Sequence, residues 1–89
     1  MQETFSKNIQ FSKLIKANGK LKEFNFLKIN DQKDNLFTVD VLDERDSRVF
    51  FNIKKIDESW KIIEIPLPEW IMENESSFSK IIEEELKQQ

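Results

Sequence analysis

The sequence predicts an α+β fold: a five-stranded antiparallel meander sheet followed by one C-terminal helix packed on one face. Apolar and polar residues alternate with a period of two through most of residues 5–65, which is typical of half-buried strands. Short polar segments interrupt this alternation as turns do. After Pro68 the apolar residues recur instead at spacings of three and four, which is the period of a helix.

The first two strands surround an Asn-Gly dipeptide in the stretch KLIKANGKLKEFNF, residues 13–26. Asn-Gly can end a helix or form the two-residue turn of a hairpin. On a helical wheel the apolar residues before it fall on opposite sides. Read as a strand, their odd-numbered positions are mostly apolar and the even-numbered positions almost wholly polar. We therefore predict strands at about residues 5–17 and 20–29, joined by a hairpin turn.

A turn at Asn18 and Gly19 pairs Ala17 with Lys20 and so sets the register of this hairpin. The other pairs predicted on the same face are Phe11–Phe26, Lys13–Phe24 and Ile15–Lys22. Phenylalanines and lysines share this face, with the lysines gathered toward the turn. We expect the base of the hairpin to be packed and its tip to project into water, where its lysines discourage edge-to-edge pairing.

The third and fourth strands, at about residues 36–42 and 48–56, show the most regular alternation. Pairing Val41 with Val49 brings the other apolar residues of both strands onto one face. The pairs that follow from this register are Val39–Phe51 and Phe37–Ile53. A short acidic turn then leads to a fifth strand at about residues 60–65.

The segment IPLPEWI, residues 65–71, ends the sheet, because a proline cannot donate a ladder hydrogen bond. Pro68 suits the first turn of a helix, and we predict a helix at about residues 68–87. Its apolar stripe consists of Ile71, Phe78, Ile82 and Leu86, flanked by Trp70 and Ile81. Ser76 or Ser77 can instead cap a second, shorter helix, so the sequence leaves open a break near residue 75.

The composition indicates a single domain, residues 1–89, with little capacity for catalysis. The chain has no His, Cys or Tyr, which removes the commonest general base, the thiolate nucleophile and the usual transition-metal ligands. The densest acidic cluster is Asp40, Asp43, Glu44 and Asp46. Its spacing is not that of an EF-hand calcium loop. We expect no enzymatic activity, no cofactor and no metal site.

The sequence also bears on location. No apolar run exceeds three residues, and the segment MQETFSKNIQ lacks the apolar stretch of a signal peptide. The absence of cysteine fits a reducing compartment. We therefore expect a cytoplasmic protein that does not cross a membrane.

One face of the predicted sheet has no covering element. A single helix covers about half of the other face. Phe50, Leu36 and Leu42 point away from the core set, so we predict them as a candidate interface. Self-association is the commonest way to cover such a face, and we expect a homodimer. The alternative is a strongly curled sheet that wraps its helix and leaves these residues as isolated surface side chains.

The charge distribution suggests a second kind of partner. The net charge is −3, but residues 1–30 carry six lysines against two acidic residues. Proteins that bind single-stranded nucleic acid present basic grooves with aromatic side chains on which bases stack. A candidate nucleic-acid face consists of Lys13, Lys20, Lys22, Phe24, Arg48 and Lys54.

The stretch RVFFNIKKIDESWKIIE, residues 48–64, resembles a hairpin of the purine-rich-element-binding (PUR) repeats, over about a fifth of the chain. Those repeats have several antiparallel strands followed by one helix. Their single-repeat bacterial members act as dimers that bind nucleic acid. The resemblance therefore implies a homodimer that binds single-stranded nucleic acid.

Taken as a whole, the sequence favours a small non-enzymatic interaction module that forms a homodimer, without naming its cellular role. The alternative function is single-stranded nucleic-acid binding by a protein of PUR-like architecture. A third class, a carrier with an apolar ligand pocket between sheet and helix, has no specific residue to support it.

Overall fold

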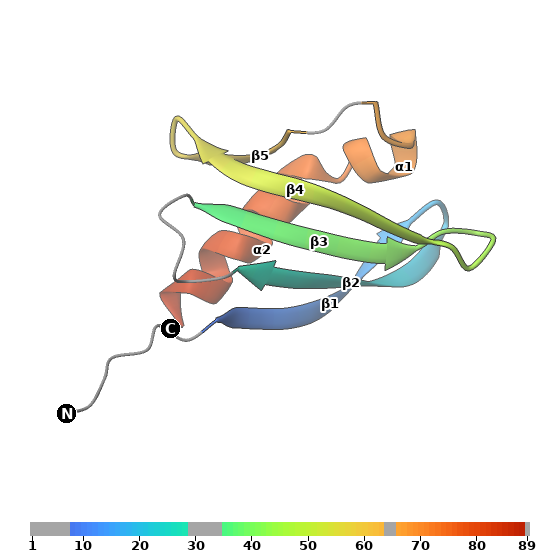
Figure 1. Ribbon diagram of the computed structural model, residues 1–89, viewed down its shortest axis with the longest axis horizontal. Helices are drawn as coiled ribbons and strands as arrows, with labels where there is room; N and C mark the ends of the chain where they lie inside the picture. Colours follow the sequence, from blue (N-terminus) through green and yellow to red (C-terminus); the bar gives the residue numbers. More distant parts are fainter. Residues whose placement is uncertain (1–7, 29–34, 64–65, 89) are drawn as a thin grey trace.

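The computed structural model describes residues 8–28, 35–63 and 66–88 and confirms the predicted α+β fold (Figure 1). Five antiparallel strands form one sheet in chain order. The strands are β1 (Ile9–Ala17), β2 (Lys20–Lys28), β3 (Leu36–Leu42), β4 (Arg48–Ile56) and β5 (Ser59–Ile62). Two helices follow, α1 (Glu69–Met72) and α2 (Glu75–Lys87). Residues 5–7, 29, 64 and 65 of the predicted strands lie outside the described part of the chain.

The hairpin registers are those that the alternation of the sequence predicts. Ala17 pairs with Lys20 at the first turn. The other predicted pairs are also present, namely Phe11–Phe26, Lys13–Phe24, Ile15–Lys22, Val41–Val49, Val39–Phe51 and Phe37–Ile53. Asn18 and Gly19 have φ angles of 57° and 77°, the left-handed region that a tight two-residue turn requires.

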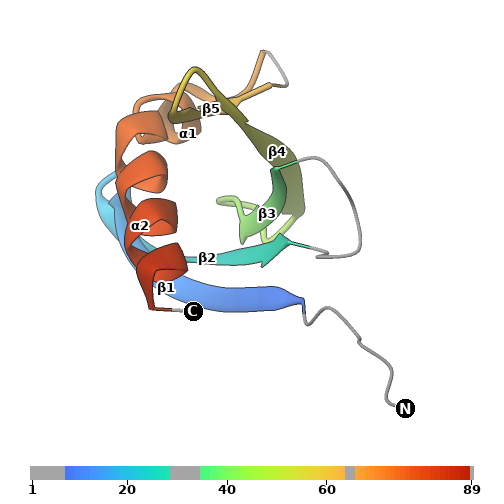
Figure 2. The same ribbon diagram turned by 90° about the vertical axis from the view of Figure 1, so that its left-hand side faces the viewer.

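The sheet curls around α2, so that its inner face and the helix enclose one core (Figure 2). The buried side chains are Ile15, Ala17, Phe24, Phe26, Phe37, Val39, Val41, Phe51, Ile53, Trp60, Ile62, Ile71, Phe78 and Ile82. Phe78 of α2 contacts three rings of the sheet. The centroid distances are 5.2 Å to Phe24, 6.1 Å to Phe26 and 5.7 Å to Phe51. The curl allows α2, together with Ile71 of the short helix α1, to fill the inner face.

The tip of the β1–β2 hairpin meets the expectation in part: Asn18, Gly19 and Lys20 at the turn are exposed, whereas the inner side beside the turn is packed. Ile15 and Ala17 are buried, and the side chain of Lys22 is only 11% exposed. The Lys22 ammonium lies 5.1 Å from the ring centroid of Trp70 in α1. The inner side is packed because Trp70 of α1, which the expectation took no account of, lies over Lys22 at this end of the sheet.

The C-terminal helix is broken between α1 and α2, which answers the question that the sequence left open. Asn74 lies at the break, where its side-chain Nδ2 donates to Trp70 O at 2.9 Å and its N–H donates to Ile71 O at 3.0 Å. In a continuous α-helix the Asn74 N–H would donate to Trp70 O instead. The asparagine side chain therefore competes with the helix for its own acceptor. Ser76 and Ser77 lie inside α2, and neither caps it.

The free edge of β5 is sealed by side chains of α2. The Trp60 N–H donates to Ser79 Oγ at 3.1 Å, and the Ile62 N–H donates to Glu75 Oε2 at 2.8 Å. The Trp60 indole donates to Glu83 Oε2 at 2.8 Å, and this hydrogen bond lowers the pKa of the Glu83 carboxyl. The helix thus satisfies backbone donors that an edge strand would otherwise leave unpaired.

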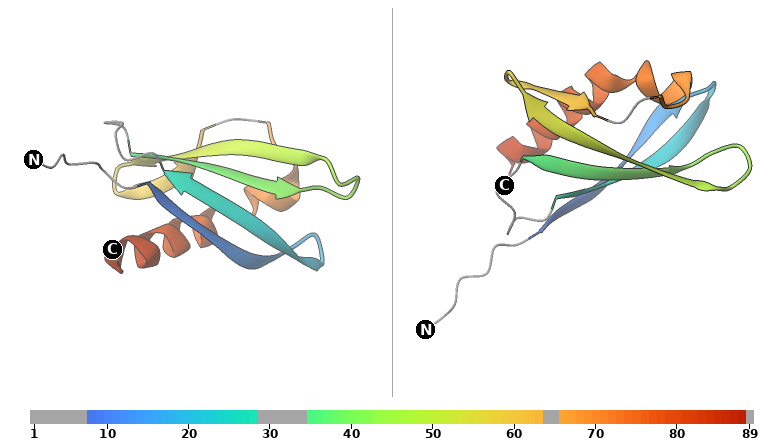
Figure 3. Two further views of the ribbon diagram at one scale, coloured as in Figure 1. Left: turned by 60° about the horizontal axis from the view of Figure 1, so that its bottom comes forward. Right: turned by 45° about the horizontal axis from the view of Figure 1, so that its top comes forward.

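Among the described residues, β2 and β3 are paired over a short distance only. Their paired residues are Asn25–Asp40, Phe26–Val39 and Leu27–Thr38. Residues 20–24 of β2 pair with β1 but with no described residue of β3. The β1–β2 and β3–β4 hairpins therefore diverge toward their tips (Figure 3), and a cleft of about 340 Å³ lies between them.

Candidate functional site

Five large apolar side chains of the described strands are exposed on the outer face of the sheet, the face turned away from α2, and one of them, Ile56, lies apart at the far end of β4. The other four come one from each of β1 to β4 and form the outer apolar stripe: Leu14, Leu21, Leu42 and Phe50. Their exposed fractions are 66%, 67%, 40% and 61%. Several exposed apolar side chains on one face mark surfaces that meet another molecule more often than scattered apolar residues do.

The strand register arranges the stripe as two diagonal pairs, with Glu23 directly opposite Leu14 and Arg48 directly opposite Leu42. Leu14 and Leu21 are diagonal cross-strand neighbours in the β1–β2 register, about 7–8 Å apart. Leu42 and Phe50 are diagonal neighbours in the β3–β4 register in the same way. Leu21 and Leu42 both line the cleft between the two hairpins. The stripe therefore crosses four strands with the cleft at its centre.

The structure brings two of the three predicted interface residues together. Phe50 and Leu42 belong to the stripe, whereas Leu36 is half-buried at the other end of β3, about 20 Å from Leu42. Leu14 and Leu21 were not predicted. Their signal in the sequence is that each is an apolar residue on the polar face of its strand, beside a lysine.

A row of polar side chains crosses the outer face beside the stripe. Ser12 Oγ donates to Asn25 Oδ1 at 2.6 Å, and Asn25 Nδ2 donates to Asp40 Oδ1 at 2.8 Å. Arg48 Nη1 also donates to Asp40 Oδ1, at 2.6 Å. The polar groups of this row are thus satisfied within the chain, and Arg48 is paired with a carboxylate.

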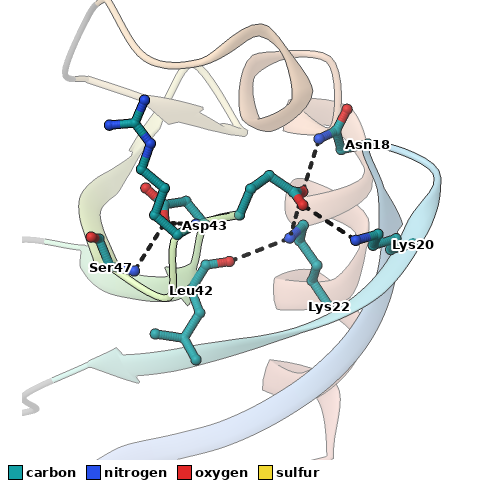
Figure 4. Close-up of polar contacts among 8 residues, drawn as sticks. Asn18, Lys20, Lys22, Leu42, Asp43 and Ser47 are labelled. Atoms are coloured by element: carbon teal, nitrogen blue, oxygen red, sulfur yellow. Dashed lines mark hydrogen bonds and ion pairs between the residues drawn. The ribbon is translucent and has the colours of Figure 1, made fainter.

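The cleft is bridged by Glu44, which lies in the loop between β3 and β4. Its carboxylate accepts from Asn18 Nδ2 at 2.9 Å, from Lys22 Nζ at 3.1 Å and from Lys20 Nζ at 3.3 Å. Lys22 Nζ also lies 3.5 Å from Leu42 O, so it contacts both sides of the cleft (Figure 4). Glu44 therefore holds the tips of two hairpins that share no ladder hydrogen bonds at this level.

Neutralising Glu44 is expected to remove a pH-dependent part of the stability. Hydrogen bonds from Asn18, then Lys22 and Lys20, lower the pKa of Glu44 from 4.5 to about 2. Because the folded pKa is below the unfolded one, the carboxylate stabilises the folded state above pH 4.5, and this contribution is lost as pH falls to about 2. In Glu44→Gln the urea midpoint should be below that of the wild type near neutral pH.

The same comparison at low pH separates the charge from other effects of the substitution. The midpoints of Glu44→Gln and the wild type should converge as pH falls toward 2. The difference near neutral pH should also shrink at high salt, because the Glu44 side chain is 43% exposed. A gap between the two proteins that is the same at all pH values contradicts this role for Glu44.

The candidate nucleic-acid residues do not form one surface. Phe24 is fully buried on the inner face, in contact with α2, and Lys13, Lys20 and Lys22 alternate onto that same side. The other two members, Arg48 and Lys54, point to the outer face. The sequence did not reveal the partners of three of these cations. Lys20 and Lys22 are paired with Glu44, and Arg48 is paired with Asp40.

The acidic loop has a structural role in the described structure. Asp43 Oδ1 accepts from the N–H groups of Arg45 and Ser47, at 2.8 Å and 2.9 Å, and so shapes the β3–β4 turn. Among residues 8–28, 35–63 and 66–88, no three His, Cys, Asp or Glu side chains gather as metal ligands would. Within the same residues, no helix has the length and apolar content needed to span a membrane.

The fold and the outer face define a small α+β protein in which a curled antiparallel sheet wraps a helix and presents an apolar stripe on its convex side. Comparison of the chain with family models, with curated proteins and with solved structures finds no match.

Proposed function

We propose that the protein is a small non-enzymatic interaction module that forms a homodimer and uses the outer apolar stripe in binding. The observation that supports this is the exposure of Leu14, Leu21, Leu42 and Phe50 on one face. Burying such side chains is the main source of favourable free energy in protein association. A cysteine-free chain suits a reducing compartment such as the cytoplasm.

The size and chemistry of the outer face suit a protein partner. Five strands spaced about 4.8 Å apart, with up to nine residues each, give a face of about 20 Å by 30 Å. That is roughly 600 Å², near the ~800 Å² that each partner buries in a standard interface. The polar row beside the stripe is already hydrogen-bonded, so covering it leaves Ser12, Asn25 and Asp40 paired.

Light scattering on the purified protein tests the proposal. The wild type should have the mass of a dimer at micromolar concentration. Charging both ends of the stripe, in the double variant Leu14→Lys with Phe50→Lys, should give a monomer. The matched control is Ile56→Lys, which charges a 43% exposed residue of the outer face outside the stripe and should leave the dimer intact. A strictly monomeric wild type rejects the homodimer.

A specific observation also favours the second candidate, single-stranded nucleic-acid binding. Lys54 and Lys61 lie directly opposite each other on the outer face, and Phe50 is exposed on the same face. Like charges directly opposite destabilise a sheet, and a polyanion laid across them would offset that repulsion. A base can stack on an exposed phenylalanine.

A fluorescent single-stranded oligonucleotide, titrated at two salt concentrations, tests this candidate. Binding should weaken as salt rises, because phosphate contacts release counterions. The double variant Lys54→Ala with Lys61→Ala should bind more weakly and with a smaller salt dependence. Absence of binding at low salt rejects the candidate.

A further inference from the structure

The two edges of the sheet differ in how they are protected. Along β5, side chains of α2 accept hydrogen bonds from Trp60 and Ile62. Along β1, no strand and no side chain of the described chain accepts from or donates to the backbone on the side away from β2. Figure 2 shows β1 at the open margin of the curled sheet. Within residues 8–28, 35–63 and 66–88, one edge is therefore closed by the helix, and the other is open.

The open edge presents a regular set of backbone groups. The two-residue turn makes Ala17 and Lys20 a hydrogen-bonded pair, so odd-numbered residues of β1 exchange hydrogen bonds with β2. The N–H and C=O groups of the even-numbered residues point the other way. These residues are Gln10, Ser12, Leu14 and Lys16. A nine-residue edge of this kind, about 30 Å long, is a template for another strand.

We propose that β1 of a second copy pairs with this edge in the antiparallel sense, about a twofold axis at Leu14, to give one continuous ten-stranded sheet. The inference rests on the proposed function, because it takes the partner to be a second copy. A twofold axis is the commonest symmetry of homo-oligomers, and two identical edge strands related by a twofold axis perpendicular to the sheet run antiparallel with the same face outward.

The side chains favour an axis at Leu14. In this register Leu14 lies directly opposite Leu14 of the second copy, and residues 11–17 of the two chains are paired. Lys13 is then opposite Ile15 of the second copy, and Lys16 is opposite Ser12 of the second copy. No lysine faces a lysine, and a leucine that is 66% exposed in the single chain gains an apolar cross-strand partner.

Neighbouring registers are less favourable. An axis at Lys13 pairs more residues but sets the two Lys13 ammonium groups directly opposite each other. An axis at Ser12 leaves Leu14 opposite Gln10 of the second copy. An axis at Ile15 pairs only residues 13–17 and sets Leu14 opposite Lys16 of the second copy. The edge lysines, expected from the sequence to discourage pairing, would here select one register.

Pairing of the two β1 edges would also join the two outer apolar stripes. The stripe runs from Phe50 through Leu42 and Leu21 to Leu14, which is its member on the edge strand. With Leu14 on the axis, the stripe of one copy continues into that of the other across all the central strands. The dimer would thus present a single apolar band about twice as long as that of one chain.

The test compares one substitution at two matched positions. Leu14 and Leu21 are 66% and 67% exposed, lie on the same face and are diagonal neighbours, but only Leu14 is on the edge strand. By analytical ultracentrifugation, Leu14→Lys should raise the dimer dissociation constant about tenfold or more, because it sets two lysines opposite each other on the axis. Leu21→Lys and Phe50→Lys should leave it within about threefold.

The outcomes separate this inference from the proposed function. A dimer that survives Leu14→Lys but dissociates in Phe50→Lys points to face-to-face association, which overturns the edge pairing and leaves the interaction module standing. Equal weakening by Leu14→Lys and Leu21→Lys also overturns it. A wild type that is monomeric overturns both. Circular dichroism of Leu14→Lys checks folding, which the exposure of Leu14 in the single chain should preserve.

Hydrogen exchange gives a second readout that does not depend on a variant. Exchange of the Ser12, Leu14 and Lys16 amides should slow as protein concentration rises, because dimer formation supplies their acceptors. The amides of Lys13 and Ile15 are already hydrogen-bonded to β2. Their exchange rates should change little with protein concentration while only a small fraction of the protein is dimeric. Protection of the even-numbered amides that is independent of concentration overturns the proposal.

Discussion

Replacing Phe78 by alanine is expected to destabilise the protein by about 3–5 kcal/mol. The ring is fully buried and contacts three phenylalanines of the sheet, so its removal leaves a cavity at the centre of the only core that the described residues form. A chain of 89 residues has a total stability of about 4–13 kcal/mol. The variant should therefore be largely unfolded or close to it, which urea denaturation followed by circular dichroism measures.

The control for this prediction is Phe50→Ala. It removes the same ring from a position that is 61% exposed, so the free energy of unfolding should change by about 0.5 kcal/mol or less at protein concentrations where the chain is monomeric. If the two alanine variants lose the same stability, the assignment of inner and outer faces is wrong.

Replacing Glu75 by alanine is expected to cost about 1–3 kcal/mol. The carboxylate accepts the Ile62 N–H at 2.8 Å, and Ile62 is only 8% exposed. Without that acceptor a backbone donor at the β5 edge is left without its protein partner and sparingly hydrated. Urea denaturation gives the loss of stability, and hydrogen exchange should show faster exchange of the Ile62 amide.

The matched control is Glu84→Ala, which removes an exposed carboxylate from the same helix. Its free energy of unfolding should stay within about 0.5 kcal/mol of the wild type. An Ile62 amide that exchanges equally fast in the wild type and in Glu75→Ala would show that α2 does not seal the β5 edge.

The hairpins could be predicted from the sequence because local chemistry specifies them. Asn18 and Gly19 fit a two-residue turn, and once the turn is placed the pairing of β1 with β2 follows residue by residue. In β3 and β4 only one register sets the apolar residues of the inner face against one another, as Val41–Val49, Val39–Phe51 and Phe37–Ile53. Alternation and turn chemistry act over short distances, where a single sequence is informative.

The contacts between distant segments could not be predicted, because no local pattern encodes them. Glu44 reaches Asn18 across 26 positions of the chain, and Glu75 reaches Ile62 across a helix break. The curl of the sheet, the divergence of β2 from β3 and the cover that Trp70 provides are of the same kind. Each of these features depends on how the strands and helices pack together in three dimensions. The spacing of apolar and polar residues along the chain carries no information about that packing.

Two of the four residues of the outer apolar stripe could be predicted from the sequence. Phe50 and Leu42 stand out as large apolar residues on the wrong side of regular strands. Leu14 and Leu21 show the same parity, but single leucines between polar residues are ordinary on protein surfaces. Only the register, which makes Leu14 and Leu21, and likewise Leu42 and Phe50, diagonal neighbours at one end of the sheet, distinguishes the outer apolar stripe from scattered exposure.

The short seam between β2 and β3 has a mechanical consequence. Among the described residues three paired positions join the two hairpins, so we expect the hairpins to move as two units about a hinge near Phe26 and Val39. Bending at that hinge would change the width of the cleft and the distance from Leu21 to Leu42. The backbone hydrogen bonds within each hairpin would stay intact. The easiest motion of the sheet would then be this bending, which lengthens or shortens the outer apolar stripe.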